Sequence, residues 1–211
     1  MKAWTSPSSF EVIVDRLNGL ARRVPVWLVY IVYAAPAPWL VWLGATGGLG
    51  AEPIKALEHE LGEIGLQLLI IGLAITPLRR HLGINLLRFR RAFGLLTFFY
   101  IVLHLLVWLV LDIRDPVRIW ADIVKRPYIT VGMLAFVLMI PLAVTSNNLS
   151  VRRLGARWRQ LHRLVYGIAI LGAAHFILLS KGFQIEPWAY LAVILLLLAL
   201  RIPVRRKTRP V

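Results

Sequence analysis

Residues 161–176 read LHRLVYGIAILGAAHF and place His162 and His175 in an apolar run whose only charged residue is Arg163. In a helix that rises about 1.5 Å per residue, the two imidazoles lie roughly 20 Å apart along the axis. That distance covers most of a hydrocarbon core about 30 Å thick. Polar side chains inside a membrane usually face a bundle interior or a ligand, because exposing them to lipid is costly. The stretch therefore predicts a membrane helix whose two histidines face a bundle interior or a ligand at two depths.

The composition of the whole chain is that of an integral membrane protein. The 211 residues are 59% hydrophobic and 17% charged, and the mean hydropathy is +0.72. A soluble domain is nearer 45–50% apolar and about 25% charged. The absence of cysteine excludes disulfides, iron–sulfur clusters and covalently attached c-type haem. A net charge of +15 in so apolar a chain indicates basic cytoplasmic loops beside membrane lipid, and we expect no nucleic-acid partner.

Apolar runs predict an all-α bundle of six membrane-spanning helices that forms a single domain over residues 1–211. We expect the first span to be kinked by its prolines and the second to end at Thr76-Pro77. A Gly-rich loop and an acidic approach are expected at 44–60, and a short interfacial helix around Trp120. The predicted spans are approximately 24–43, 61–77, 92–111, 128–146, 161–180 and 188–202.

The distribution of charge predicts that both termini are cytoplasmic. With the N-terminus inside and six alternating spans, most of the 25 Lys and Arg residues fall inside and most of the 10 Asp and Glu residues fall outside. Lys and Arg in short loops set the orientation of membrane helices. An even number of spans also agrees with the two basic termini.

This topology brings two histidines to one depth. The third and fifth predicted spans both run from inside to outside, and His104 and His175 lie about 20 Å and about 22 Å along them. Two imidazoles on separate helices near the outer leaflet are the arrangement that a bis-histidine haem b requires. The alternative is that the histidines are hydrogen-bonding partners between helices of a redox-inert transporter or assembly subunit.

The remaining histidines have weaker patterns. His162 lies near the inner leaflet, where two interpretations stay open: a ligand of a second haem, or a structural hydrogen bond. His59 is expected in a solvated loop, with a propionate or partner contact as the alternative. His81 is expected not to bind iron. Some inner arginines are candidates for binding haem propionates or a flavin phosphate, and simple topology determinants are the alternative. The candidates are Arg79, Arg91, Arg157 and Arg163.

Several segments together resemble a known family. The chain is similar to the MsrQ family of bacterial haem-binding membrane subunits, within the wider ferric reductase and NADPH oxidase transmembrane superfamily. The matching segments are GGLGAEPIK at 47–55, ITPLRR at 75–80, RRAFGL at 90–95, KRPYITVG at 125–132, LGARWRQLHRLVY at 154–166 and AHF at 174–176.

The resemblance implies an electron-transfer subunit of a two-component methionine sulfoxide reductase in the bacterial inner membrane. It implies haem ligation by His104, His162 and His175, and bound FMN at a position that the residues do not indicate. Electrons would arrive from a cytoplasmic flavin reductase or the quinone pool. They would leave to MsrP, a periplasmic molybdopterin subunit that holds the catalytic site. A quinone-linked cytochrome b for another dehydrogenase is the alternative redox function. One departure stands out, because the third span has arginines where the oxidases have an inner histidine.

Overall fold

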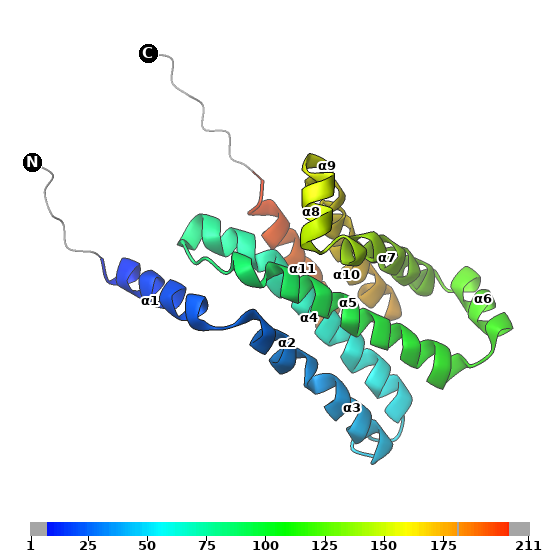
Figure 1. Cartoon of the computed structure of the whole chain (residues 1–211). Coiled ribbons are helices and arrows are strands. Elements are labelled where there is room, and N and C mark those ends of the chain that lie inside the picture. Colours follow the sequence, from blue (N-terminus) through cyan, green and yellow to red (C-terminus); the bar gives the residue numbers. More distant parts are fainter. Residues whose placement is uncertain (1–7, 181, 203–211) are drawn as a thin grey trace, which may run out of the picture.

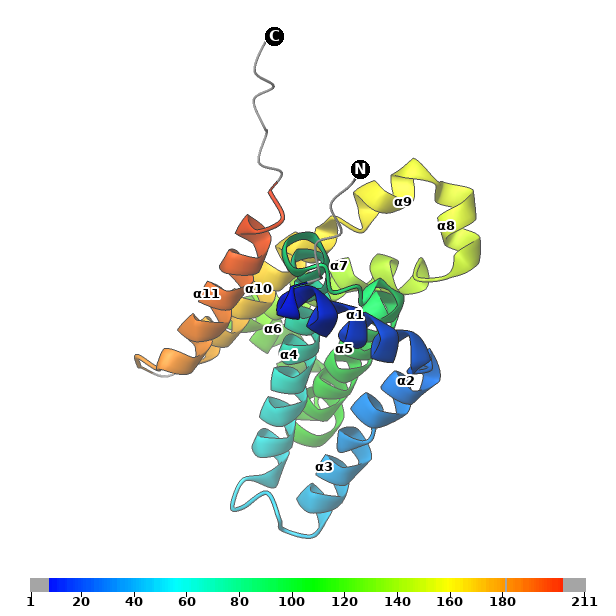
Figure 2. The same ribbon diagram turned by 90° about the vertical axis from the view of Figure 1, so that its left-hand side faces the viewer.

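The computed structural model describes residues 8–180 and 182–202, and within them the chain is a bundle of helices (Figures 1 and 2). The long helices run roughly alongside one another, with short helices at both ends of the bundle. The helices are α1 (Ser9–Arg23), α2 (Val26–Ala34), α3 (Pro36–Ala45), α4 (Pro53–Leu82), η1 (Leu87–Phe89), α5 (Arg90–Leu106), η2 (Val107–Ile113), α6 (Pro116–Lys125), α7 (Pro127–Val144), α8 (Asn148–Leu154), α9 (Ala156–Leu161), α10 (Leu164–Leu179) and α11 (Ile185–Ala199).

Five helical segments of the described residues are long and apolar enough to cross a membrane. They are Val26–Ala45, Pro53–Leu82, Leu87–Ile113, Pro127–Val144 and Ala156–Leu179. The sixth expected span is α11, a shorter apolar helix of 15 residues. At about 1.5 Å per residue it extends roughly 22 Å, which is less than the hydrocarbon core. The prediction of an all-helical membrane protein is thus confirmed for the described residues, with five helical segments of spanning length and one shorter apolar helix. The sixth span and the sides of the termini stay predictions.

Prolines interrupt the first span, as expected. Helix α2 ends at Ala34, and α3 begins with Pro36 in its first turn. A proline lacks an amide hydrogen and is tolerated in the first turn, where that hydrogen has no helical partner.

Helix α4 is longer than predicted at both ends. It begins at Pro53, so the expected acidic approach is already helical. It then continues through Pro77 to Leu82, where Gly83 ends it with φ +73°. The prediction that this helix stops at Thr76-Pro77 is therefore wrong. Pro77 removes one amide, and the carbonyl of Leu73 that it leaves accepts a hydrogen bond from Arg201 instead.

The stretch 161–176 is not one continuous helix. Helix α9 ends at Leu161 and α10 begins at Leu164, with His162 and Arg163 in the turn between them. His162 and His175 therefore do not share a helix axis, and the assumption behind their 20 Å separation is wrong. His162 lies at the end of the bundle that holds the basic loops, where Arg91 of α5 bonds Asn148 of α8.

Helix α4 lies between two packed clusters. One joins α4 to α2, α3 and α5, and includes Leu61, Leu68 and the fully buried Tyr100. The other joins α4 to α7, α10 and α11, and includes Ala169 and Ile194. Many outward-facing side chains are large and apolar, as expected for lipid-facing surfaces.

Helices α1 and α6 each expose large apolar side chains. Helix α1 begins with a capping box between Ser8 and Glu11, and its Asn18 side chain holds Gly83 and Asn85 after α4. Helix α6 begins at Pro116, is capped by the side chain of Asp115, and contains Trp120 as expected.

Candidate functional site

A cavity of about 900 Å³ lies among α4, α5, α7 and α10. We call it the pair cavity, because His104 and His175 both line it. Its wall is mostly apolar, and polar side chains gather at the end near the start of α4 and α7. The apolar wall includes Leu66, Leu69, Ile101, Leu105, Phe136, Met139 and Phe176, and the polar end includes Glu52, Lys55, Glu58, His59, Asp112 and Arg126.

Helix α5 presents His104 to this cavity. Its Nδ1 lies 2.8 Å from the main-chain oxygen of Glu58 on α4. A carbonyl can only accept, so the hydrogen is on Nδ1, and Nε2 is left with its lone pair. The helix changes to a π-helix at Val107, three residues after His104. Such π-helical turns are frequent at functional sites.

His175 on α10 repeats the arrangement. Its Nδ1 lies 2.7 Å from the main-chain oxygen of Tyr128 at the start of α7. The ring centres of His104 and His175 are 6.1 Å apart, and their planes cross at 87°. The predicted convergence of these two histidines from separate helices is therefore present in the structure.

The spacing of the two ring centres matches that of two imidazoles on one metal. With metal–nitrogen bonds of about 2.0–2.1 Å, as imidazoles make to zinc, and roughly 1 Å from each nitrogen to its ring centre, two axial rings lie about 6 Å apart. A metal-binding histidine usually donates its other N–H to a carbonyl or carboxylate, as both do here. The described residues contain no group of three or more His, Cys, Asp or Glu that could hold a bare ion. A haem needs only two protein ligands, and the cavity volume lies within the usual range of cofactor sites.

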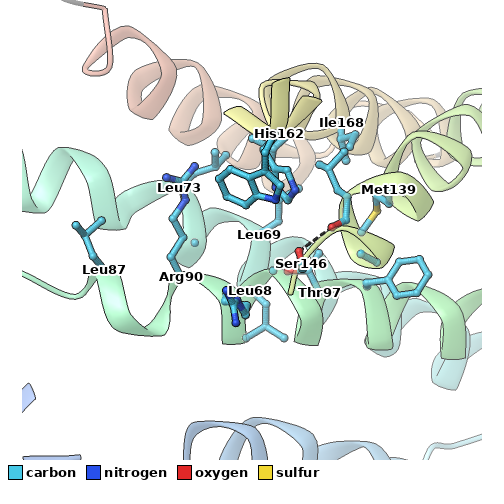
Figure 3. A pocket seen from close by; sticks show the side chains of 18 of the residues that line it. Leu68, Leu69, Leu73, Leu87, Arg90, Thr97, Met139, Ser146, His162 and Ile168 are labelled. Carbon is cyan, nitrogen blue, oxygen red and sulfur yellow. Dashed lines mark hydrogen bonds between the residues drawn. The ribbon is translucent and has the colours of Figure 1, made fainter. Parts of the chain in front are cut away.

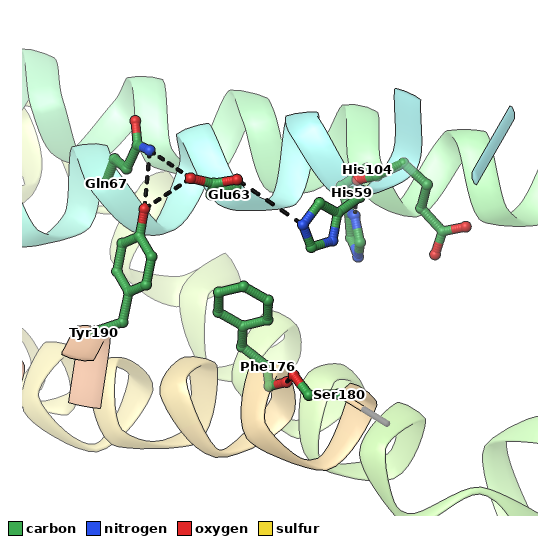
Figure 4. Close-up of polar contacts among 8 residues, drawn as sticks. His59, Glu63, Gln67, His104, Phe176, Ser180 and Tyr190 are labelled. Atoms are coloured by element: carbon green, nitrogen blue, oxygen red, sulfur yellow. Dashed lines mark hydrogen bonds and ion pairs between the residues drawn. The ribbon is translucent and has the colours of Figure 1, made fainter. Parts of the chain in front are cut away.

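His59 lies on a helix and not in the expected loop, although its side chain is exposed, as expected. It belongs to α4, lines the pair cavity and packs edge-on against Phe176 with ring centres 5.5 Å apart. Its Nε2 lies 3.9 Å from a carboxylate oxygen of Glu63. The other Glu63 oxygen accepts hydrogen bonds from Gln67 and Tyr190, each 2.8 Å long (Figure 4). This network ties α4 to α11 beside the cavity.

A second, smaller cavity of about 380 Å³ lies at the end of the bundle with the basic loops. We call it the arginine cavity, because Arg88, Arg90, Arg91 and Arg201 line it (Figure 3). His162 also lines it.

The surroundings of His162 differ from those of the histidine pair. Its Nε2 lies 3.0 Å from the hydroxyl of Thr145, and its ring stacks on Trp158 at 3.9 Å between centres. No second histidine lines the arginine cavity among the described residues. The Nε2 of His81 lies 3.0 Å from the Leu200 carbonyl. His81 lines neither cavity.

Only one of the predicted arginines lies at a cavity. Arg91 lines the arginine cavity and donates a hydrogen bond to Asn148. Arg79, Arg157 and Arg163 are exposed and line neither cavity. The arginines that sequence reasoning did not select are Arg88, Arg90 and Arg201. Arg88 and Arg90 belong to a basic run that the sequence shows. Arg201 is a charged residue at the end of an apolar helix, a pattern that often indicates a functional position.

Four residues line both cavities: Leu69, Thr97, Met139 and Ile168. They come from α4, α5, α7 and α10, the same four helices that enclose the pair cavity. The two cavities therefore adjoin at these four residues.

Comparison with known proteins agrees with this architecture. A profile of the ferric reductase like transmembrane component family matches residues 61–173, a segment that contains His104 and His162. Over 196 residues the chain is 46% identical to the protein-methionine-sulfoxide reductase heme-binding subunit MsrQ of Agrobacterium fabrum, covering 92% of this chain and 91% of the relative. The chain belongs to the MsrQ family.

Two further relatives are also MsrQ heme-binding subunits by name. The protein of Brucella anthropi is 47% identical, and that of Brucella ovis is 48% identical. Each alignment covers 88% of this chain and 86% of the relative. No solved structure matches the chain.

Proposed function

We propose that this MsrQ family member is a haem b electron-transfer subunit, with His104 and His175 as the axial ligands in the pair cavity. The observation that carries the proposal is the crossed pair of imidazoles, 6.1 Å apart, each with Nδ1 bonded to a backbone carbonyl. The relatives are named as heme-binding subunits, which supports the same assignment.

Bound haem would supply reversible one-electron chemistry, and the chain supplies the surroundings. His104 and His175 fix the ring tautomers through their carbonyl partners, which leaves both Nε2 atoms available. The apolar wall, including Phe136, Met139 and Phe176, keeps water away from the site. Lys55 and Arg126 are the fixed cations at the polar end of the cavity among the described residues, and they could pair with propionates.

The arginine cavity is proposed as the side that receives electrons. Its arginines suit an anionic, planar partner, either FMN or a second haem, and His162 stacked on Trp158 offers a flat surface for it. A second bis-histidine haem is not supported there, because His162 has no histidine opposite it. The donor would be a cytoplasmic flavin reductase or a quinone.

We further propose that electrons cross from the arginine cavity to the pair cavity and leave to MsrP, a periplasmic molybdopterin subunit. The basic end of the bundle would then face the cytoplasm of a bacterium and the pair cavity the periplasm, as the bias of Lys and Arg favours. Sulfoxide reduction would occur on the partner.

One observation favours a different function. Both histidines of the pair already make hydrogen bonds between helices, as structural histidines in a redox-inert subunit would. A quinone-linked cytochrome b for another dehydrogenase also remains compatible with the pair cavity.

Spectroscopy of the purified protein decides between these functions. The oxidised and dithionite-reduced spectra are recorded after expression with ample haem supply, and haem is quantified as the pyridine haemochromogen. We expect a haem b spectrum that His104→Ala and His175→Ala abolish and that the control His81→Ala retains. A protein without a Soret band would refute the redox functions. Reoxidation of the reduced protein by MsrP plus a sulfoxide separates the proposed partner from another dehydrogenase.

A further inference from the structure

Each histidine of the pair cavity packs against a glycine of the neighbouring helix. A Cβ atom at Gly62 would lie 3.0 Å from Nδ1 of His104 and 3.2 Å from its Cε1. A Cβ atom at Gly132 would lie 2.7 Å from Nδ1 of His175 and 2.9 Å from its Cε1. Contacts shorter than 3.0 Å are essentially absent for real Cβ atoms. A side chain at Gly132 would therefore displace the ring, and one at Gly62 would press on it.

The two glycines have the same register relative to the carbonyls that hold the rings. His104 bonds the carbonyl of Glu58, four residues before the first glycine, and His175 bonds that of Tyr128, four residues before the second. In an α-helix this carbonyl points toward the amide four residues later and has a second lone pair free. A ring that reaches the second lone pair must lie over the later position. Only glycine leaves that position open.

This double restraint fixes how each ring is turned. The bond at Nδ1 holds one edge of the imidazole, and the glycine backbone allows that edge to lie against the helix. His104 rests in this way on α4 and His175 on α7, and the two ring planes cross at 87°. The crossed arrangement therefore follows from the positions of two helices and two glycines.

We propose that Gly62 and Gly132 are positioning residues that hold the imidazoles of His104 and His175 crosswise on the iron of a bound haem b. This inference rests on the proposed function, since it takes the two histidines as axial ligands. Each imidazole plane splits the two iron d orbitals that overlap its π system. Parallel planes reinforce this splitting, whereas crossed planes cancel it.

The electronic consequence is measurable. Low-spin ferric iron between crossed imidazoles gives a highly anisotropic electron paramagnetic resonance signal, dominated by one feature at low field. Iron between parallel imidazoles gives three well-separated features. The orientation of the axial ligands can thus be observed without any enzymatic assay.

The experiment compares four full-length proteins in detergent: wild type, Gly62→Ala, Gly132→Ala and Gly167→Ala. Gly167 is the matched control, because it lies on α10 like His175 and a Cβ there meets nothing within 4 Å. Haem content, low-temperature resonance spectra of the ferric proteins and midpoint potentials are measured. The three nearest atoms to each added Cβ belong to an imidazole ring, which can turn toward the cavity, so both test variants are expected to fold.

We expect the single low-field signal in the wild type and in Gly167→Ala. In Gly132→Ala the signal should move toward the three-feature form, or haem should be lost at unchanged helicity, and Gly62→Ala should show a smaller shift of the same kind. A three-feature signal in haem-loaded wild type overturns the inference, as do alanine variants with the wild-type signal. A test variant that does not accumulate in the membrane also counts against it. Wild type without haem refutes the proposed function instead.

Discussion

Arg201 donates a hydrogen bond to the main-chain oxygen of Leu73, the carbonyl that Pro77 leaves without its helical amide. The guanidinium also lies over the ring of Tyr166, 5.3 Å from its centre. A proline can therefore sit inside α4 because a cation from the end of α11 replaces the missing donor. Arg201 fastens the short last helix to the central one.

Replacing Arg201 with methionine should destabilise the bundle. A hydrogen bond from a charged donor contributes about 1.5–3 kcal/mol, and partial exposure of Arg201 places the expected loss at the lower end. For a chain of this size that corresponds to a thermal midpoint lower by a few degrees. The measurement is thermal unfolding in detergent at a fixed scan rate.

The double variant makes this prediction specific. In a Pro77→Ala background an amide is again available to Leu73, so Arg201→Met should cost clearly less than in the wild type. Arg79→Met, at an exposed position near the end of α4, is the control and should change little. Equal losses in both backgrounds would contradict the replacement of the amide by Arg201.

His162 should matter for electron uptake and not for haem in the pair cavity. We expect His162→Ala to retain the haem that His104→Ala loses, because His162 lies in the arginine cavity beside Thr145 and Trp158. Its reduction by a flavin reductase with reduced flavin should be slower than that of the wild type. Stopped-flow absorbance of the haem measures this rate.

Thr145→Val provides a milder test of the same site. It removes the hydroxyl that meets Nε2 of His162 while keeping the size of the side chain. Its reduction rate should lie between those of the wild type and His162→Ala. A His162→Ala protein reduced at the wild-type rate would remove His162 from the path.

The convergence of His104 and His175 was predictable because helix rise converts sequence offset into depth. Two basic loops marked where the third and fifth spans begin, and similar offsets then gave similar depths. The prediction required no knowledge of packing. It depended on helix rise counted from a recognisable basic loop, and the turn at His162 and Arg163 did not prevent the convergence.

Other features depended on partners distant in the sequence. Pro77 signals the end of a helix when taken alone, and only Arg201 allows α4 to continue. The break at His162 and Arg163 contains neither glycine nor proline. His59 followed a Gly-rich loop, so the early start of α4 at Pro53 was missed. At Pro77 a tertiary contact outweighed the local signal, whereas Pro53 in the first turn of α4 was itself a local signal for a helix start.

The hydroxyl of Tyr190 should stabilise the contact between α4 and α11. It donates to Glu63 and accepts from Gln67, which joins three polar side chains within an apolar bundle. Side-chain hydrogen bonds between membrane helices contribute about 0.6 kcal/mol on average and at most about 1.7. Tyr190→Phe should lower the unfolding free energy within that range, as measured by denaturation in mixed micelles.

Tyr30→Phe is the control for this change, since its hydroxyl makes no hydrogen bond within the described part of the chain. It should leave stability unaltered. If Tyr190→Phe were as stable as Tyr30→Phe, the network of Figure 4 would have no net effect on packing.

Helix α6 should lie in the membrane interface with its apolar face toward lipid. Val117, Trp120 and Val124 recur at helical spacing and are 77%, 69% and 66% exposed. Because the chain has no cysteine, a single cysteine can be labelled cleanly. An environment-sensitive fluorophore at Val117→Cys in liposomes should emit at shorter wavelength than one at Arg118→Cys. The Arg118 side chain is 78% exposed, so the two labelled positions differ only in whether they face the membrane. Equal emission wavelengths at both positions would place α6 in water.

Single cysteines can also determine the orientation of the bundle. Arg118 on α6 and Arg153 on α8 are both exposed and lie on segments at opposite ends of the long helices (Figure 1). If the basic end faces the cytoplasm, a membrane-impermeant maleimide should label Arg118→Cys in intact spheroplasts. Arg153→Cys should react only after permeabilisation. The reverse pattern would overturn the proposed direction of electron transfer while leaving the haem assignment intact, because the geometry of His104 and His175 does not depend on which side faces the periplasm.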